Sequence, residues 1–229
     1  MEERGPREQD ILYRDRTEAG RRLARAVAGA VAARGRDVLV VGLPRGGVAV
    51  AREVAEALGA SLDVLVAKKL RSPVSEELAI GAVTPSGQVV LHRDLLRSLG
   101  VTRAYVEQEC RQRAAEAQQA ERFYRHGRPP QPVKDRTVVV VDDGVATGAT
   151  AEVAVQALRA LGAARVVVAT PVGSPEAMAR LARVADQVVC LATPPEFYAV
   201  GQFYREFEPV PDEEVQRLLE EYRTRPEAA

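Results

Sequence analysis

Two adjacent acids, placed between an apolar run and a loop of small residues, are the residues best suited to do chemistry. Asp142 and Asp143 follow Val138–Val141, and the loop is Ala146-Thr147-Gly148-Ala149-Thr150. Backbone N–H groups of small residues can approach an anion closely, and a helix beginning after the loop favours negative charge there. Two carboxylates would repel a bare phosphate. We therefore expect a sugar phosphate such as ribose 5-phosphate, with its hydroxyls on the acids and its phosphate in the loop.

The same stretch has simpler interpretations. It could be only a polar strand end with a turn, or one of the two aspartates could accept a phosphoryl group as a nucleophile. The second interpretation does not explain the Thr-Gly-Ala-Thr loop. Other motifs are missing, because no Gly-Lys-Ser/Thr opens the helix and neither GxGxxG nor GxSxG occurs.

A glycine-rich loop follows an earlier apolar run, in Val41-Gly42-Leu43-Pro44-Arg45-Gly46-Gly47. Gly46 and Gly47 permit close backbone approach, and Arg45 offers a planar fork of donors for phosphate oxygens. An ordinary strand-to-helix turn is the alternative, since paired glycines are common there.

Lys68 and Lys69 are two of only three lysines in the chain, and they follow the apolar run Leu62–Ala67. We expect this run to be a strand that delivers them to the same sheet edge. Adjacent strand residues face opposite sides, so one of the two would enter the site. A solvated basic turn is the alternative interpretation.

Apolar β-branched runs alternate with helical patterns, which predicts a doubly wound α/β fold with a mostly parallel sheet. The expected strands are 37–43, 62–67, 137–141, 165–169 and 187–191, and the expected helices are 17–33, 47–58, 149–161 and 175–184. Ligands of such sheets bind at the carboxyl ends of strands.

The stretch from 72 to 132 interrupts this alternation. It contains an expected hairpin around Pro85-Ser86-Gly87 and a long polar helix beginning at Thr102. We expect one domain over residues 1–229, with residues 72–132 and 194–229 forming a lid or hood over the sheet edge.

Composition excludes several classes of protein. The 229 residues carry 32 Lys+Arg and 32 Asp+Glu, and zero net charge gives no general attraction to nucleic acid or to an anionic membrane. No apolar run approaches the roughly 20 residues that span a bilayer. The first residues, Met1–Arg4, lack the apolar stretch of a signal peptide, so we expect a cytoplasmic protein.

The thirteen residues Val138–Thr150 resemble the phosphoribosyl-pyrophosphate signature of type I phosphoribosyltransferases. The whole chain also resembles an uncharacterised branch of that family with the forms DDGxATGAT, PRGGV and FYAVGQ. The resemblance implies that Asp142 and Asp143 bind the ribose hydroxyls and that Ala146–Thr150 hold the 5-phosphate. It also implies that the loop at Gly46 and Gly47 binds pyrophosphate and contains a strained peptide at or near Pro44–Arg45.

By the same resemblance, Arg45 and a basic residue at Lys68 or Lys69 face the pyrophosphate. The implied activity is Mg2+-dependent transfer of ribose 5-phosphate from phosphoribosyl pyrophosphate to a nitrogenous base in nucleotide metabolism. Mg2+ would be held mainly by the oxygens of the ligand, with no direct protein ligand. The alternative is a non-catalytic regulator that binds phosphoribosyl pyrophosphate or a nucleotide. The assembly, a homodimer for example, is left open.

The acceptor is expected to be a small planar molecule that lies beyond the strand 165–169. Candidate residues for this pocket are Thr170, Pro171, Val172, Phe197 and Tyr198. The aromatic segment 197–207 could stack a planar ring, or it could be a small core that anchors the C-terminal segment. Members with purine substrates commonly have an acid where this chain has Ala146, which leaves the acceptor unassigned.

Overall fold

Five short apolar runs form a single parallel sheet in the computed structural model, which describes residues 11–75 and 78–224. The strands are β1 (Val38–Gly42), β2 (Ser61–Val64), β6 (Thr137–Val141), β7 (Arg165–Val172) and β8 (Gln187–Ala192), in the order β2-β1-β6-β7-β8. Valine-rich strands of this kind are typical of a sheet covered on both faces. The predicted doubly wound α/β class is confirmed. The residues behind the signal-peptide expectation, and 225–229 of the second expected lid segment, lie outside the described residues.

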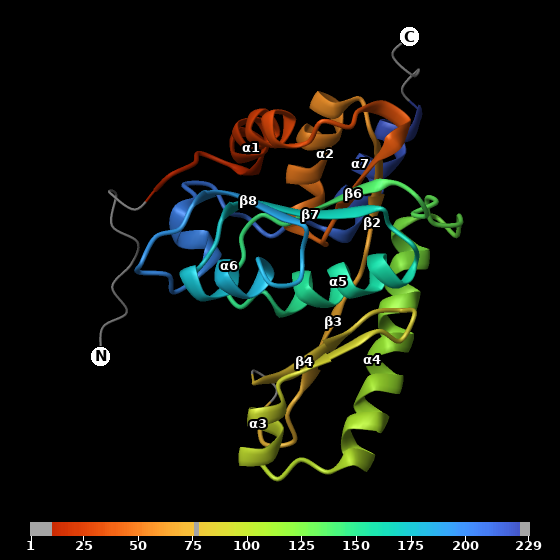
Figure 1. Ribbon diagram of the computed structural model, residues 1–229, viewed down its shortest axis with the longest axis vertical. Coiled ribbons are helices and arrows are strands. Elements are labelled where there is room, and N and C mark those ends of the chain that lie inside the picture. The colour runs from red at the N-terminus through yellow and green to blue at the C-terminus, as the bar shows by residue number, and fades with distance from the viewer. Residues whose placement is uncertain (1–10, 76–77, 225–229) are drawn as a thin grey trace.

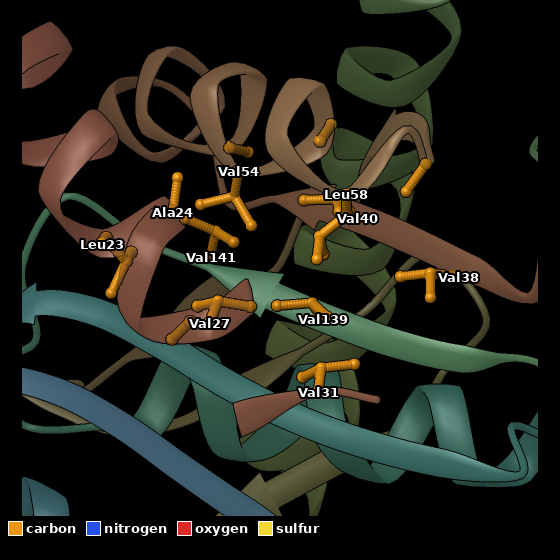
Figure 2. Close-up of a cluster of buried hydrophobic side chains, with 14 of the residues drawn as sticks. Leu23, Ala24, Val27, Val31, Val38, Val40, Val54, Leu58, Val139 and Val141 are labelled. Atoms are coloured by element: carbon orange, nitrogen blue, oxygen red, sulfur yellow. The ribbon is translucent and has the colours of Figure 1, made fainter. Parts of the chain in front are cut away.

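Alternate residues of each central strand point to opposite faces and form two separate cores. Val40, Val139 and Val167 pack under α1 (Arg16–Ala30) and α2 (Gly46–Leu58). Figure 2 shows this cluster, with Leu23, Val27 and Val54 of the two helices above the strands. Leu39, Val138 and Val166 pack instead on α5 (Ala149–Ala160) and α6 (Pro175–Leu181). The two pairs of helices therefore cover opposite faces of the sheet (Figure 1).

A second sheet extends away from the first, at the bottom of Figure 1. It is antiparallel, with β3 (Lys68–Arg71), β4 (Ala79–Val83) and β5 (Val89–Leu91) in that order. The helices α3 (Arg93–Ser98) and α4 (Arg103–Tyr124) contribute to its apolar core with Leu70 and Ile80. The hairpin at Pro85–Gly87 is confirmed. So is the helix start at Thr102, whose hydroxyl accepts from the Tyr105 amide at 3.3 Å.

The predicted strand over 62–67 is too long. β2 ends at Val64, opposite Gly42 at the end of β1, and the last hydrogen bond between them runs from the Leu65 amide to the Gly42 carbonyl at 3.2 Å. The next amide, that of Val66, donates to Glu121 Oε1 of α4 at 3.0 Å. The chain then leaves the parallel sheet, and Lys68 begins β3.

The N-terminal residues of the described chain pair with the segment 203–206 at the carboxyl end of the parallel sheet. The amides of Leu12 and Tyr13 donate to the carbonyl of Phe203, and the Arg205 amide donates to the carbonyl of Tyr13 at 3.0 Å. The segment 203–206 begins at the end of the short helix η3 (Val200–Phe203) and precedes α7 (Asp212–Thr224). Another 3-10 turn, η2 (Gly35–Asp37), leads into β1. No described helix is long and apolar enough to cross a membrane.

A nearly buried arginine fastens the long helix α4 to the parallel sheet. Arg125 Nε donates to Asp63 Oδ1 at 2.9 Å, and its other nitrogens reach Glu121 Oε2 and the carbonyl of Val64. The side chains of Arg125 and Asp63 are only 12% and 9% exposed. Breaking a buried pair by removing one partner leaves the other charge without compensation.

We therefore expect Arg125→Met to reduce the free energy of unfolding by about 3 kcal/mol, as when other buried ion pairs lose one partner. Chemical denaturation followed by circular dichroism would measure the loss. The control is Arg122→Met, because Arg122 is exposed on the same helix. Equal stability of the two variants would contradict the anchoring role of Arg125.

Candidate functional site

The two acids lie at the carboxyl end of the central strand β6, where the backbone turns away from the sheet. The amide of Asp142 still donates to the carbonyl of Ala169 in β7 at 3.3 Å. The amide of Asp143 donates to Asp142 Oδ1 at 2.9 Å, so the Asp142 side chain holds the backbone of Asp143 in place. The pair is thereby fixed next to the carboxyl ends of β1 and β7, its neighbours in the sheet.

The glycine-rich loop after β1 packs directly against this pair. A Cβ atom on Gly46 would lie 1.8 Å from Asp143 Oδ2, and one on Gly47 would lie 2.7 Å from the carbonyl oxygen of Val141. No side chain fits at either position, so the glycines are required for this approach. The Pro44–Arg45 peptide is cis, at the place where the resemblance put an unusual peptide. Two motifs almost a hundred residues apart in sequence therefore lie in contact at one end of the sheet.

The small-residue loop presents a run of backbone donors. Among the described residues, the amides of Ala146 to Thr150 donate to no protein acceptor. Gly148 has a φ of +77°, which turns the chain into the first residue of α5. Ser174 Oγ donates to the carbonyl of Ala146 at 2.7 Å. This bond anchors the loop through a carbonyl group and does not engage its amides. Amides left without partners in such a turn form an anion-binding nest at the start of a helix.

A second set of unpartnered amides lies in the glycine-rich loop. The N–H groups of Arg45, Gly46 and Gly47 have no acceptor within the part of the chain that the structure describes. They open α2, whose N-terminus again favours negative charge. The acid pair thus lies between two loops that can each accept an anion.

The electrostatics of the two acids differ. Burial raises the pKa of Asp142 well above its usual value, and the negative charge of Asp143 raises it further. Asp143 is paired instead with Arg16, whose Nε lies 2.7 Å from Asp143 Oδ2, and both side chains are 13% exposed. Asp143 is therefore a largely buried carboxylate with a charged partner.

Arg16 contacts the acid pair, and the sequence analysis missed it. It is separated from Asp143 by 127 positions and belongs to no motif. One signal was present, because Arg16 is the first residue of α1 and a cation is unfavourable at a helix N-terminus unless another group compensates it.

The side chains of the three predicted cations, Lys68, Lys69 and Arg45, form no hydrogen bond or ion pair with the acid pair in the described structure. Lys68 and Lys69 do not end β2 but begin β3 in the second sheet, because the parallel ladder stops at Val64. Within the described residues, no hydrogen bond or ion pair joins either lysine to the acids or the two loops. Arg45 is closer by position, since its backbone opens α2, but its guanidinium lies 3.9 Å from Asp212 of α7.

The acceptor candidates divide into buried and exposed residues. Thr170 and Val172 are fully buried, and the carbonyl of Pro171 accepts a hydrogen bond from the Tyr13 hydroxyl at 2.8 Å. Phe197 packs on Phe203 with ring centroids 5.0 Å apart. Tyr198, by contrast, is 83% exposed. The aromatic segment is therefore mainly a small core, and Tyr198 is the ring it leaves accessible.

A separate cavity of about 520 Å³ is lined by Leu62, Asp63 and the end of α4. Neither the acid pair nor the two amide-lined loops contribute to it. Its arginines are held in ion pairs, Arg128 and Arg223 with Glu220 and Arg125 with Asp63.

Comparison with known proteins identifies the family. Residues 84–207 match the model of the phosphoribosyl transferase domain. The chain is also 43% identical to the protein TT1426 from Thermus thermophilus, whose crystal structure it matches with a TM-score of 0.78 over 93% of this chain and 99% of that one. This chain belongs to the phosphoribosyl transferase family.

A curated relative from Mycobacterium tuberculosis, named "Putative phosphoribosyl transferase Rv0571c", is 47% identical over 209 residues. The match covers 91% of this chain and 46% of the relative, so the chain spans about half the length of the curated relatives it matches.

The raised pKa of Asp142 predicts how its replacement changes stability. An acid whose pKa is higher in the folded state than in the unfolded state loses stability as pH rises above the unfolded value of about 3.9. Asp142→Asn removes that charge and keeps an Oδ1 acceptor for the Asp143 amide. We expect its melting temperature to exceed that of the wild type by several degrees at pH 7, with the difference vanishing toward pH 4.

Asp143→Asn is the matched control and should change stability in the opposite direction at pH 7, because it leaves the guanidinium of Arg16 without its carboxylate partner. Differential scanning calorimetry at several pH values measures both variants. If Asp142→Asn melts at or below the wild-type temperature at pH 7, Asp142 does not carry the predicted electrostatic cost.

Proposed function

We propose that this chain binds phosphoribosyl pyrophosphate and transfers its ribose 5-phosphate group to a nitrogen of a small planar base, with release of pyrophosphate. The observation that supports this most strongly is the acid pair between two loops of unpartnered amides. Phosphoribosyl pyrophosphate has the complementary order of groups, with hydroxyls between two phosphorylated ends. Membership of the phosphoribosyl transferase family agrees with the proposal.

Each part of the ligand has a partner in this proposal. Ala146–Thr150 hold the 5-phosphate through their amides and through the hydroxyls of Thr147 and Thr150. Asp142 and Asp143 accept hydrogen bonds from the ribose hydroxyls. The amides of Gly46 and Gly47 and the guanidinium of Arg45 bind the pyrophosphate, which requires Arg45 to leave Asp212. Lys68 or Lys69 would have to reach the same phosphates from β3.

The chemistry needs no covalent attack by the protein. The bond from the anomeric carbon to pyrophosphate breaks, and pyrophosphate leaves with the electron pair. A bond from that carbon to the nitrogen of the base forms, and the base loses a proton to solvent. The protein accordingly acts by holding the two partners in line and by stabilising the charge that develops on pyrophosphate.

Mg2+ fits the chemistry of this site as a partner of the ligand. Among the described residues, no group of three or more His, Cys, Asp or Glu side chains is arranged to hold a metal. Mg2+ usually keeps several waters and binds substrate phosphates with few protein ligands. When bound to the pyrophosphate it would neutralise part of the negative charge.

Tyr198 is the residue we assign to the acceptor. Its exposed ring is carried by a segment that folds over the acids, because Val200 packs against Gly144 and the Tyr204 hydroxyl donates to the carbonyl of Asp143 at 2.5 Å. An aromatic face can stack any planar base and so selects a class of acceptor, not one molecule.

A non-catalytic regulator is the second candidate. The observation that favours it is Ala146, which stands where family members with purine substrates commonly carry an acid. The two candidates share a binding site and differ in turnover. Isothermal titration calorimetry with phosphoribosyl pyrophosphate and Mg2+ tests the site, and pyrophosphate release with a panel of purine and pyrimidine bases tests the reaction. Binding with release supports the transferase, binding without release supports the regulator, and no binding contradicts both.

The phosphate loop generates a prediction about one hydroxyl. Thr147 is exposed in the loop, and no protein acceptor or donor engages its side chain among the described residues. Because hydrogen bonds to charged groups contribute about 1.5–3 kcal/mol, Thr147→Val should weaken phosphoribosyl pyrophosphate binding by roughly 10- to 100-fold.

The melting temperature of Thr147→Val should stay at the wild-type value, since no internal contact is removed. The control is Ser98→Ala, which removes a hydroxyl bonded only to the carbonyl of Leu95 in α3, beside the second sheet. Isothermal titration calorimetry of the wild type, Thr147→Val and Ser98→Ala with phosphoribosyl pyrophosphate measures the three affinities. Unchanged affinity in Thr147→Val would remove this hydroxyl from the phosphate site.

A further inference from the structure

Arg16 joins the acid pair to the segment that precedes α7. Its Nε donates to Asp143 Oδ2 at 2.7 Å, and its Nη1 donates to the carbonyl of Glu208 at 2.8 Å. Its guanidinium also lies over the ring of Phe207, 3.9 Å from the centroid. One side chain thus contacts the strand end, the C-terminal segment and an aromatic face.

The contact between Arg16 and Asp143 lies directly over the glycine-rich loop. A Cβ atom on Gly46 would be 1.8 Å from Asp143 Oδ2 and 2.6 Å from Arg16 Nε. Arg16, Asp143 and the backbone of Gly46 are therefore packed together with no intervening space. Any shift of the guanidinium would change where the carboxylate points relative to the loop.

The surrounding segments hold Arg16 in place. The Arg205 and Glu206 amides donate to the carbonyls of Tyr13 and Arg14, so the residues before Arg16 are paired with those before Phe207. Tyr204 stacks on Phe207 at 4.9 Å between centroids, and its hydroxyl donates to the carbonyl of Asp143. Asp143 is consequently held through both its side chain and its backbone.

Stability alone is a poor reason for this arrangement. A pair in which both side chains are 13% exposed loses most of its hydration, and such pairs contribute little net stability compared with apolar packing. A cation at the first position of α1 is also unfavourable with respect to the helix dipole. The pair instead fixes the orientation of the Asp143 carboxylate and compensates its negative charge, while Asp142 lies beside it.

We propose that Arg16 is a positioning residue for ribose binding, which acts through Asp143 by holding its carboxylate oriented beside Asp142. This rests on the proposed function, since it assigns the acid pair to the ribose hydroxyls. Arg16 itself does not touch the ligand. Its loss should weaken ligands that contain ribose and spare pyrophosphate alone, whose partners are the amides of the glycine-rich loop.

Calorimetry in the presence of Mg2+ tests this with two probes, phosphoribosyl pyrophosphate and inorganic pyrophosphate. Arg16→Gln should weaken phosphoribosyl pyrophosphate binding by about tenfold or more, as expected when one partner of a close charge pair is lost. The affinity for pyrophosphate should stay within about twofold of wild type. Arg16→Lys keeps the charge but lacks the planar fork that reaches Asp143 and Glu208 together, and its affinity should lie between those of wild type and Arg16→Gln.

Two further variants separate positioning from a merely structural role. Because Arg16 acts through Asp143, adding Arg16→Gln to Asp143→Asn should weaken phosphoribosyl pyrophosphate no further than Asp143→Asn alone. Arg14→Gln, which removes a 61% exposed arginine of the same segment, should bind both probes like the wild type.

The outcomes are distinct. Equal loss of affinity for both probes, unchanged affinity, or tighter binding of phosphoribosyl pyrophosphate by Arg16→Gln would each overturn the positioning role while leaving the proposed function in place. A wild-type protein that binds no phosphoribosyl pyrophosphate would overturn the proposed function and this inference with it.

Discussion

The repulsion between two neighbouring carboxylates at the end of a buried strand is the interaction that the surrounding structure must offset. Asp142 is desolvated and faces a like charge, which raises its pKa, and the pairing of Asp143 with Arg16 offsets the second charge. The glycine-rich loop packs on Asp143, Arg16 pairs with its side chain, and the Tyr204 hydroxyl donates to its carbonyl. Such a cluster is unfavourable for an empty protein, and a ligand with several hydroxyl donors would relieve it.

The fold supplies the geometry for this site through its sheet order. The strands that end at Gly42, Val141 and Val172 are neighbours, so the loops after them start at one edge. The helices that follow two of these strands begin with unpartnered amides, which favour anions on either side of the acids. A ligand that carries both hydroxyls and phosphates would suit the negative side chains and the anion-binding backbones at once.

Local sequence signals predicted the sheet and the motif placement well, because continuous valine runs and small-residue loops need no distant partner to be recognised. They predicted less about β2, which ends together with its partner β1 instead of continuing to Ala67, and therefore misplaced Lys68 and Lys69. Arg16 was not found, since its contact with Asp143 spans 127 positions and only the folded chain creates it. For the aromatic segment the sequence allowed either a small core or a surface that stacks a planar ring. In the folded chain Phe203 is buried in a core and Tyr198 is exposed.

The central claim is that the acid pair and the loop after it form one sugar-phosphate site. The most direct measurement is a crystal structure of the protein soaked with ribose 5-phosphate. The account predicts the phosphate within hydrogen-bond distance of the amides of Ala146–Thr150 and the ribose hydroxyls on Asp142 and Asp143. A sugar phosphate bound only in the cavity beside Asp63 and Arg125, with the acid pair unoccupied, would contradict it.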